Sequence, residues 1–217
     1  MSSLALMRWL EGAPERYDAG MRWLTLGRAG RVHAALADVV EPTAQVLEIG
    51  CGTGALTQQL VDRGVRVTAF DQNPEMLDRA RARLADVASD AVVWQERAAA
   101  EIDALPEAHF DAVLAAFSLS EMSALERAHV LREARQRLRK GGLLAIGDEV
   151  RPRGAAARGL FALLRVPQAA LGWLLAGSLS HPIADLAGEL RAAGFEVAEE
   201  RQFLLGSLGV FVARPVA

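Results

Sequence analysis

This chain of 217 residues has little of what marks secreted, metal-binding or nucleic-acid-binding proteins. Its single cysteine, Cys51, excludes an internal disulfide and fits a reducing compartment. The acids and histidines lack the paired spacing of metal ligands, so no metal site is predicted. The formal net charge of −3 and the pI of about 5.9 give no electrostatic reason to expect nucleic-acid binding.

Long uninterrupted apolar runs are also missing. Met1–Glu11 has no basic stretch followed by a long apolar one, so we expect no signal peptide and a cytoplasmic location. The largely apolar segment 158–180 is broken by Arg165, Pro167 and Gln168, whereas a membrane span needs roughly 18 apolar residues in succession. We therefore expect no transmembrane span, while the arginines around this segment leave contact with a membrane surface open.

What the chain does contain is a strand, a glycine-rich turn and a helix within 46–57. The apolar strand residues run into Gly50, Gly52 and Gly54, and an amphipathic helix follows. Glycine has no Cβ and tolerates positive φ, so a ligand can lie against the backbone of such a turn. The unpaired N–H groups at the start of the helix point at the same place. This combination is typical of nucleotide-type sites.

Two ligand families fit these glycines. Gly50, Gly52 and Ala55 satisfy the dinucleotide pattern, but Glu48 lies just before them, and a carboxylate there suits a cationic ligand better than a pyrophosphate. The whole stretch, Val-Leu-Glu-Ile-Gly-Cys-Gly-Thr-Gly, resembles motif I of the class I S-adenosylmethionine-dependent methyltransferases. The resemblance implies S-adenosylmethionine as cofactor and S-adenosylhomocysteine as product.

The next strand ends in an acid at the expected spacing. Asp71 lies 21 residues after Gly50, where a carboxylate can accept both ribose hydroxyls of either kind of nucleotide. Asn73 is a good helix N-cap and Pro74 suits the first helical position. Carried over position by position, the resemblance implies a set of cofactor-binding residues: Glu48, Gly50, Cys51, Gly52, Gly54, Asp71, Gln72, Met76, Arg97, Ala98, Ala116 and Phe117. Arg97-Ala98 stands where the family usually has Asp-Ala, and Ala116 where many members have a polar residue.

Strands and helices alternate regularly through the rest of the chain. Strands are expected at 45–49, 65–70, 91–95, 110–115 and 143–147, which predicts a parallel sheet with helices on both faces. A capping box at Ser123–Glu126 opens a helix that Gly141-Gly142 close, and a last helix is expected at 183–193. The final strands, 195–201 and 208–213, have no helix between them and must form a hairpin, so the last strand is antiparallel. We thus predict an α/β, Rossmann-like, seven-stranded and mostly parallel sheet.

Catalysis of methyl transfer rests largely on alignment and desolvation, and a base is needed only if the acceptor must lose a proton. Tyr17, Asp148 and His181 are the candidate bases. Residues 1–40 are expected to form a helical cap on a methyltransferase domain spanning 41–217. A lid insertion is expected at about 151–180, where this family builds substrate lids; the segment is also compatible with a membrane contact or a homodimer interface.

Residues 45–150 resemble small-molecule methyltransferases such as the ubiquinone/menaquinone C-methyltransferases. Pro14–Gly20 and Asp148–Arg153 look like a bacterial subgroup of corrinoid protein-associated methyltransferases. The expected acceptor is a small, apolar molecule. Two alternatives stay open: an accessory protein that holds the cofactor without turnover, and a nicotinamide-dependent oxidoreductase.

Overall fold

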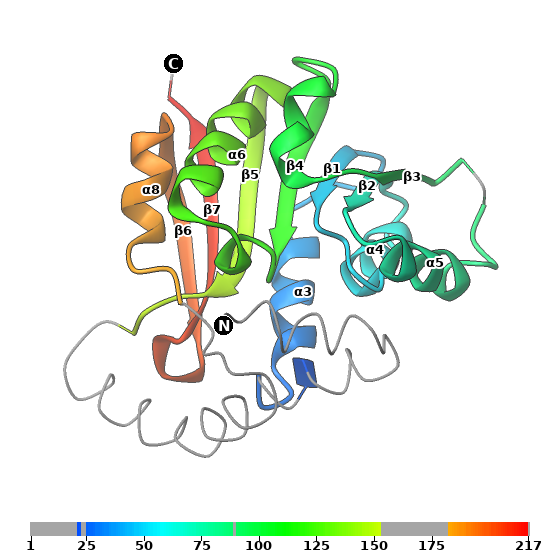
Figure 1. Cartoon of the computed structure of the whole chain (residues 1–217), viewed down its shortest axis with the longest axis horizontal. Helices are drawn as coiled ribbons and strands as arrows, with labels where there is room; N and C mark the ends of the chain where they lie inside the picture. Colours follow the sequence, from blue (N-terminus) through cyan, green and yellow to red (C-terminus); the bar gives the residue numbers. More distant parts are fainter. Residues whose placement is uncertain (1–20, 23–24, 89, 153–181, 217) are drawn as a thin grey trace.

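One seven-stranded sheet organises the molecule (Figure 1). The computed structural model describes residues 21–22, 25–88, 90–152 and 182–216. The strand order is β3-β2-β1-β4-β5-β7-β6. The bounds of the strands are β1 Gln45–Ile49, β2 Arg66–Asp71, β3 Val92–Glu96, β4 Phe110–Ala116, β5 Leu138–Glu149, β6 Phe195–Phe203 and β7 Leu208–Pro215.

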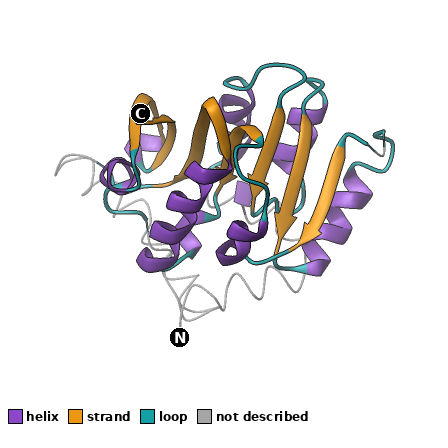
Figure 2. Ribbon diagram, turned by 90° about the horizontal axis from the view of Figure 1, so that it is seen from above, coloured by secondary structure: helices purple, strands orange, loops and turns teal. Residues whose placement is uncertain are grey.

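Helices cover both faces of this sheet (Figure 2). The α-helices are α3 Ala29–Ala37, α4 Ala55–Val61, α5 Pro74–Arg83, α6 Ala124–Arg137 and α8 Leu186–Ala192, and the 3₁₀ turns are η1 Ala99–Ala104, η2 Leu119–Glu121 and η3 Leu204–Gly206. Alternate strand residues point to opposite faces, so Val46 packs with α3 and α4 while Leu47 packs with η1 and α6. The core is therefore divided into two layers by the sheet.

The C-terminal hairpin is as predicted. β7 pairs antiparallel with both β5 and β6, while β1 to β5 pair in parallel. The mostly parallel sheet with an antiparallel last strand is thus confirmed, as is its Rossmann-like α/β class. Asn73 caps α5 and Ser123 caps α6, each by accepting a hydrogen bond from a backbone N–H two or three residues on.

Two predicted boundaries were wrong. Gly141 and Gly142 do not close a helix; α6 ends at Arg137, and β5 starts at once and contains both glycines at a shift of register against β4. The last helix begins at Leu186 rather than at residue 183, because Ile183 pairs with Val150 in an isolated bridge. The Ile183 N–H donates to the Glu149 carbonyl (2.9 Å), and the Arg151 N–H donates to the Ile183 carbonyl (3.0 Å).

The cap and lid expectations fall largely outside the described residues. Residues 1–20 and the segment 153–180 are not described, so these parts of the predicted organisation stay predictions. Within the described part of residues 1–40, α3 packs into the core beside α4, β5 and β7. Within the described residues, no helix is both long and apolar enough to span a membrane.

Candidate functional site

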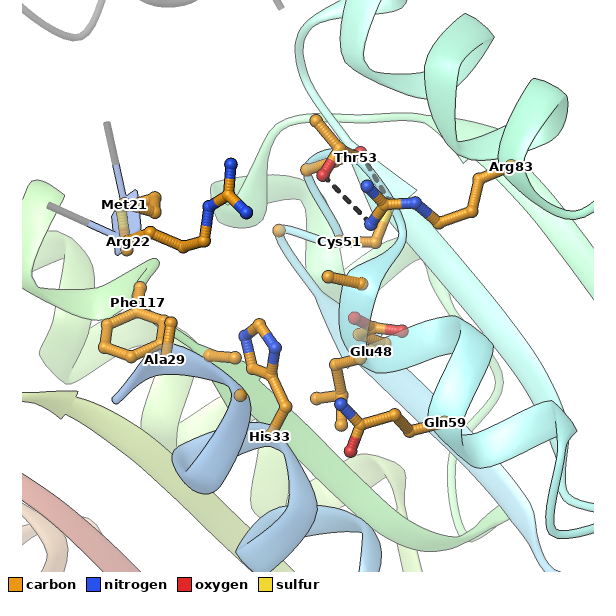
Figure 3. A pocket seen from close by; sticks show the side chains of 16 residues that line it. Met21, Arg22, Ala29, His33, Glu48, Cys51, Thr53, Gln59, Arg83 and Phe117 are labelled. Carbon is orange, nitrogen blue, oxygen red and sulfur yellow. Dashed lines mark hydrogen bonds between the residues drawn. The ribbon is translucent and has the colours of Figure 1, made fainter. Parts of the chain in front are cut away.

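A pocket of about 380 Å³ opens where β1 and β4 end, between α3 and α4 (Figure 3). It brings together six of the predicted cofactor residues: Glu48, Gly50, Cys51, Gly52, Ala116 and Phe117. They come from two neighbouring parallel strands and the turn after β1. A crevice at the carboxyl ends of the strands is the usual ligand position in an open α/β sheet.

The glycine turn keeps its shape through close contacts that only glycine permits. Gly50 has φ +66°, and a Cβ there would lie 2.7 Å from the Ser118 Cβ. Gly54, with φ +76°, starts α4, and its Cβ would lie 3.0 Å from the Ala80 Cβ of α5. The first contact brings the turn against the end of β4, and the second brings α4 against α5. Both predicted glycine positions therefore have a steric reason.

Asp71 fastens this turn to the end of β2. Its Oδ2 accepts the Gly52 N–H (2.9 Å) and its Oδ1 accepts the Asn73 N–H (2.9 Å). Burial raises the pKa of Asp71, and these backbone hydrogen bonds oppose that rise. An ionised carboxylate has about four acceptor positions, so its two oxygens can accept further hydroxyl donors.

Glu48 is the buried acid of the pocket. Its side chain is 1% exposed, and its Oε2 accepts a hydrogen bond from the Thr57 hydroxyl (2.7 Å). Burial raises the pKa of Glu48 to about 8, the Thr57 bond lowers it, and the neighbouring Asp71 charge raises it. A carboxyl in this state gains most from a cationic ligand, because the ligand's charge offsets the cost of ionisation.

Phe117 and His33 form the opposite wall. Phe117 follows β4 with φ +56°, its N–H donates to the Gly147 carbonyl (2.8 Å), and its ring meets the His33 ring edge-to-face at 5.7 Å. Positive φ in a bulky residue is strained and tends to occur at functional sites. The helix α3 brings His33 into the pocket lining (Figure 3).

Asp148 is held by backbone hydrogen bonds and is not among the residues that line the pocket. It is fully buried at the end of β5, where its Oδ2 accepts the N–H groups of Leu119 (2.9 Å) and Ser120 (3.1 Å) and its Oδ1 accepts that of Glu149 (2.7 Å). Burial raises its pKa to about 6. These bonds fix η2 to β5, and the role of Asp148 as a base stays a prediction.

The other predicted residues lie beyond this pocket or outside the described part of the chain. Met76 is buried on α5, and Gln72 is exposed beside Asp71. The Arg97 guanidinium donates to the Gln95 side chain and the Glu101 carbonyl, and the Ala98 N–H donates to the Glu101 carboxylate. Tyr17 and His181 lie outside the described residues.

Five polar side chains in the pocket lining had not been predicted as site residues: Arg22, His33, Thr53, Gln59 and Arg83. Thr53 was available from the sequence as part of the glycine turn. The arginines carry no local signal, because helix packing alone decides that they face this pocket. In the described part of the chain, no group of three or more His, Cys, Asp or Glu side chains is arranged to hold a metal.

Some known sequences match one domain of this chain, and others match most of its length. The family model for a methyltransferase domain matches residues 46–142. A phosphatidylethanolamine N-methyltransferase of Cereibacter sphaeroides is 33% identical over 170 residues, which cover 77% of this chain and 78% of that protein. A 27-O-demethylrifamycin SV methyltransferase of Amycolatopsis mediterranei is 40% identical over 107 residues, which cover 48% of this chain but 38% of that longer protein.

Solved structures agree on the fold. The structure of the mitomycin 7-O-methyltransferase matches with a TM-score of 0.70 at 20% identity, covering 100% of this chain and 61% of that one. At such an identity the likeness concerns the arrangement of strands and helices, and it includes the whole sheet described above.

Proposed function

Because this chain belongs to the class I S-adenosylmethionine-dependent methyltransferases, we propose that it transfers a methyl group to a small, largely apolar molecule. The observation that carries this proposal is the buried Glu48 carboxyl beside a glycine turn, in a pocket of about 380 Å³. S-adenosylmethionine, the cofactor of this family, has a cationic amino group that such an acid can bind. When bound, it supplies an electrophilic methyl group.

The residues present fit this cofactor. Gly50 and Gly52 of the glycine turn line the pocket, Glu48 suits the ammonium group, and Asp71 has acceptor capacity for the ribose hydroxyls. We assign the adenine end to Gln72, Met76, Arg97 and Ala98, which follow β2 and β3. Cys51 contributes through its backbone; burial raises the pKa of its thiol well above the ordinary value, so the neutral thiol predominates.

Ala116 and Phe117 then face the reacting methyl group from the end of β4. Their apolar side chains exclude water, so that alignment and desolvation of the acceptor provide most of the rate increase. His33, whose imidazole lines the pocket, is a candidate proton acceptor for a substrate that must lose a proton. Tyr17 and His181 stay predicted candidates for the same role.

The names of the relatives support a small or lipid-like acceptor, since they refer to a rifamycin and to phosphatidylethanolamine. The apolar composition of segment 158–180 supports an apolar acceptor as well. The ubiquinone/menaquinone-type and corrinoid-associated subgroups, the cytoplasmic location and a homodimer stay predictions.

Calorimetry tests the cofactor proposal directly. We expect S-adenosylmethionine and S-adenosylhomocysteine to bind at micromolar concentration and NAD not to bind. Glu48→Gln and Asp71→Asn should each weaken binding by about tenfold or more, as expected for the loss of a charged hydrogen-bond partner. Asp78→Asn on the exposed side of α5 is the control and should bind as the unmodified protein does. Unchanged affinity in both site variants would contradict the assignment of the pocket.

A further inference from the structure

The connection between β4 and α6 packs against the glycine turn. Its first residue, Phe117, lines the pocket, and the hydroxyl of the next, Ser118, donates to the Ile49 carbonyl at the end of β1 (3.0 Å). The Ser118 Cβ also occupies the space beside Gly50, where it would lie 2.7 Å from an added Cβ. Residues 117–122, the wall segment, therefore form one side of the pocket and contact the turn directly.

The wall segment begins in a strained conformation. Phe117 has φ +56°, which a bulky residue keeps only where the surrounding contacts enforce it. The Phe117 N–H donates to the Gly147 carbonyl of β5 (2.8 Å), one residue before Asp148. β5 itself pairs with β4 on one side and with β7 on the other, so it is a firm support for the segment.

Asp148 holds the middle of the wall segment to this support. Its Oδ2 accepts the N–H groups of Leu119 (2.9 Å) and Ser120 (3.1 Å), and the carboxyl group is fully buried. Buried N–H groups are costly to leave without an acceptor, so the segment has no equivalent place to go while this carboxyl is present. Asp148 thus reaches the pocket wall from a neighbouring strand without lining the pocket itself.

Arg127 of α6 holds the far end of the segment. One of its Nη atoms donates to the Met122 carbonyl (2.7 Å), while the rest of the guanidinium binds both carboxylate oxygens of Glu189 on α8 (2.8 and 2.9 Å). The wall segment is therefore attached to β1 through Ser118, to β5 through Asp148 and to α6 through Arg127. Its position against the turn depends on side chains from three elements.

We propose that Asp148 is a positioning residue of the pocket, which acts on the cofactor site through the wall segment. With the carboxyl in place, Phe117 stays in the lining and Ser118 stays against the glycine turn. Without it, the strain at Phe117 is released and the turn loses the support of Ser118. The inference rests on the proposed function in one respect, since it takes the glycine turn to be where the cofactor binds.

Cys51 provides a probe of this contact that needs no ligand. It is the single cysteine of the chain, lies in the glycine turn and is 6% exposed, so the rate at which a disulfide reagent labels it reports how often the turn opens. Labelling is measured for Asp148→Ala, Asp148→Asn and Ser118→Ala. The matched control is Asp111→Ala, because Asp111 accepts the Gln45 N–H (2.8 Å) where β4 and β1 begin, at the other edge of the sheet.

We expect Asp148→Ala to label about tenfold faster and to bind S-adenosylhomocysteine about tenfold more weakly in calorimetry, because two hydrogen bonds to the wall segment are lost. Asp148→Asn should show a smaller change, since its amide oxygen can still accept the Leu119 and Ser120 N–H groups. Ser118→Ala should label faster by a factor of a few, and it keeps the test valid if Asp148→Ala does not fold. Asp111→Ala should label as the unmodified protein does.

Denaturant separates local opening from a general loss of stability. Local opening exposes little surface, so the faster labelling should depend only weakly on urea concentration. The positioning role is overturned if Asp148→Ala and Ser118→Ala label no faster than Asp111→Ala, or if their labelling rises with urea as steeply as global unfolding does. Faster local labelling with unchanged affinity for S-adenosylhomocysteine would overturn the link to the cofactor site. An unmodified protein that does not bind S-adenosylhomocysteine would contradict the proposed function, and the labelling rates would still decide whether Asp148 positions the wall segment.

Discussion

Two buried acids at the ends of β1 and β5 show how similar residues acquire different tasks. Glu48 and Asp148 are both almost inaccessible to solvent, and burial raises the pKa of each, to about 8 and about 6 respectively. Asp148 accepts hydrogen bonds from three backbone N–H groups, whereas Glu48 accepts one from the Thr57 hydroxyl. The acid that the backbone saturates holds structure, and the acid with fewer donors faces the pocket and is suited to a cationic ligand.

The largest effect is expected from Asp148→Ala. The substitution leaves three N–H groups at the end of β5 and in η2 without their acceptor, so we expect the free energy of unfolding to fall by about 3 kcal/mol. Denaturant unfolding measures this, with Asp78→Ala, an exposed acid, as the control. Asp148→Asn keeps one acceptor oxygen and should lose less. If Asp148→Ala were as stable as the unmodified protein, the different tasks assigned to the two acids would be contradicted.

Glu48 should make cofactor binding depend on pH. With a pKa of about 8 in the ligand-free protein, the carboxyl is largely protonated at neutral pH, and binding of a cation should release that proton. Affinity for S-adenosylmethionine should therefore rise between pH 6 and 8, by at most about tenfold per pH unit. Calorimetry in two buffers of different ionisation enthalpy measures the number of protons released when the ligand binds. The Glu48→Gln variant should release none. A pH-independent affinity in the unmodified protein would contradict this role.

The raised pKa of Glu48 also determines how the free energy of unfolding changes with pH. Folding raises the pKa of Glu48 from its ordinary value of 4.5 to about 8, so the folded chain holds this proton more tightly than the unfolded chain does. The contribution of Glu48 to the free energy of unfolding is therefore largest below pH 4.5. The gain is lost as the pH rises toward about 8. Asp148, with a pKa of about 6, should lose its corresponding gain over a lower range. Replacing Glu48 with Gln should therefore flatten the decline in stability between pH 6 and 8.

The smallest effect is expected from Thr57→Val. This nearly isosteric change removes the hydroxyl that donates to Glu48 and so raises the pKa of the carboxyl further. At pH 7 the affinity for S-adenosylmethionine should fall by a factor of a few, because ionisation of Glu48 becomes more costly. The loss should shrink at higher pH, where the carboxyl is ionised in both proteins. A loss that is constant across pH would indicate a packing defect instead.

Much of the fold was predictable because its signals are local. The alternation of strands and helices and the helix-free connection before β7 each follow from a short stretch of sequence. The end of α6 was not predictable from Gly141-Gly142, since pairing with β4 extends β5 through both glycines. Strand pairing of this kind depends on residues far away in the sequence.

The site was predictable to a smaller extent. The glycine turn and Glu48 have a recognisable pattern, and the structure brings them together with Ala116 and Phe117. Asp148 looks from the sequence like another acid at a strand end, and its three amide donors are apparent only after η2 has folded back on β5. His33, Arg22 and Arg83 depend on how the helices pack, which no spacing in the sequence reveals.

The bridge between Val150 and Ile183 affects how the protein responds to changes in the length of the chain between these two residues. The chain leaves the sheet after β5 and returns beside the same residues, where backbone hydrogen bonds join Glu149 and Arg151 to Ile183. The entropic cost of closing a loop grows slowly with its length. Insertions and deletions between these two anchor points should therefore cost little stability and leave the pairing of β5 undisturbed.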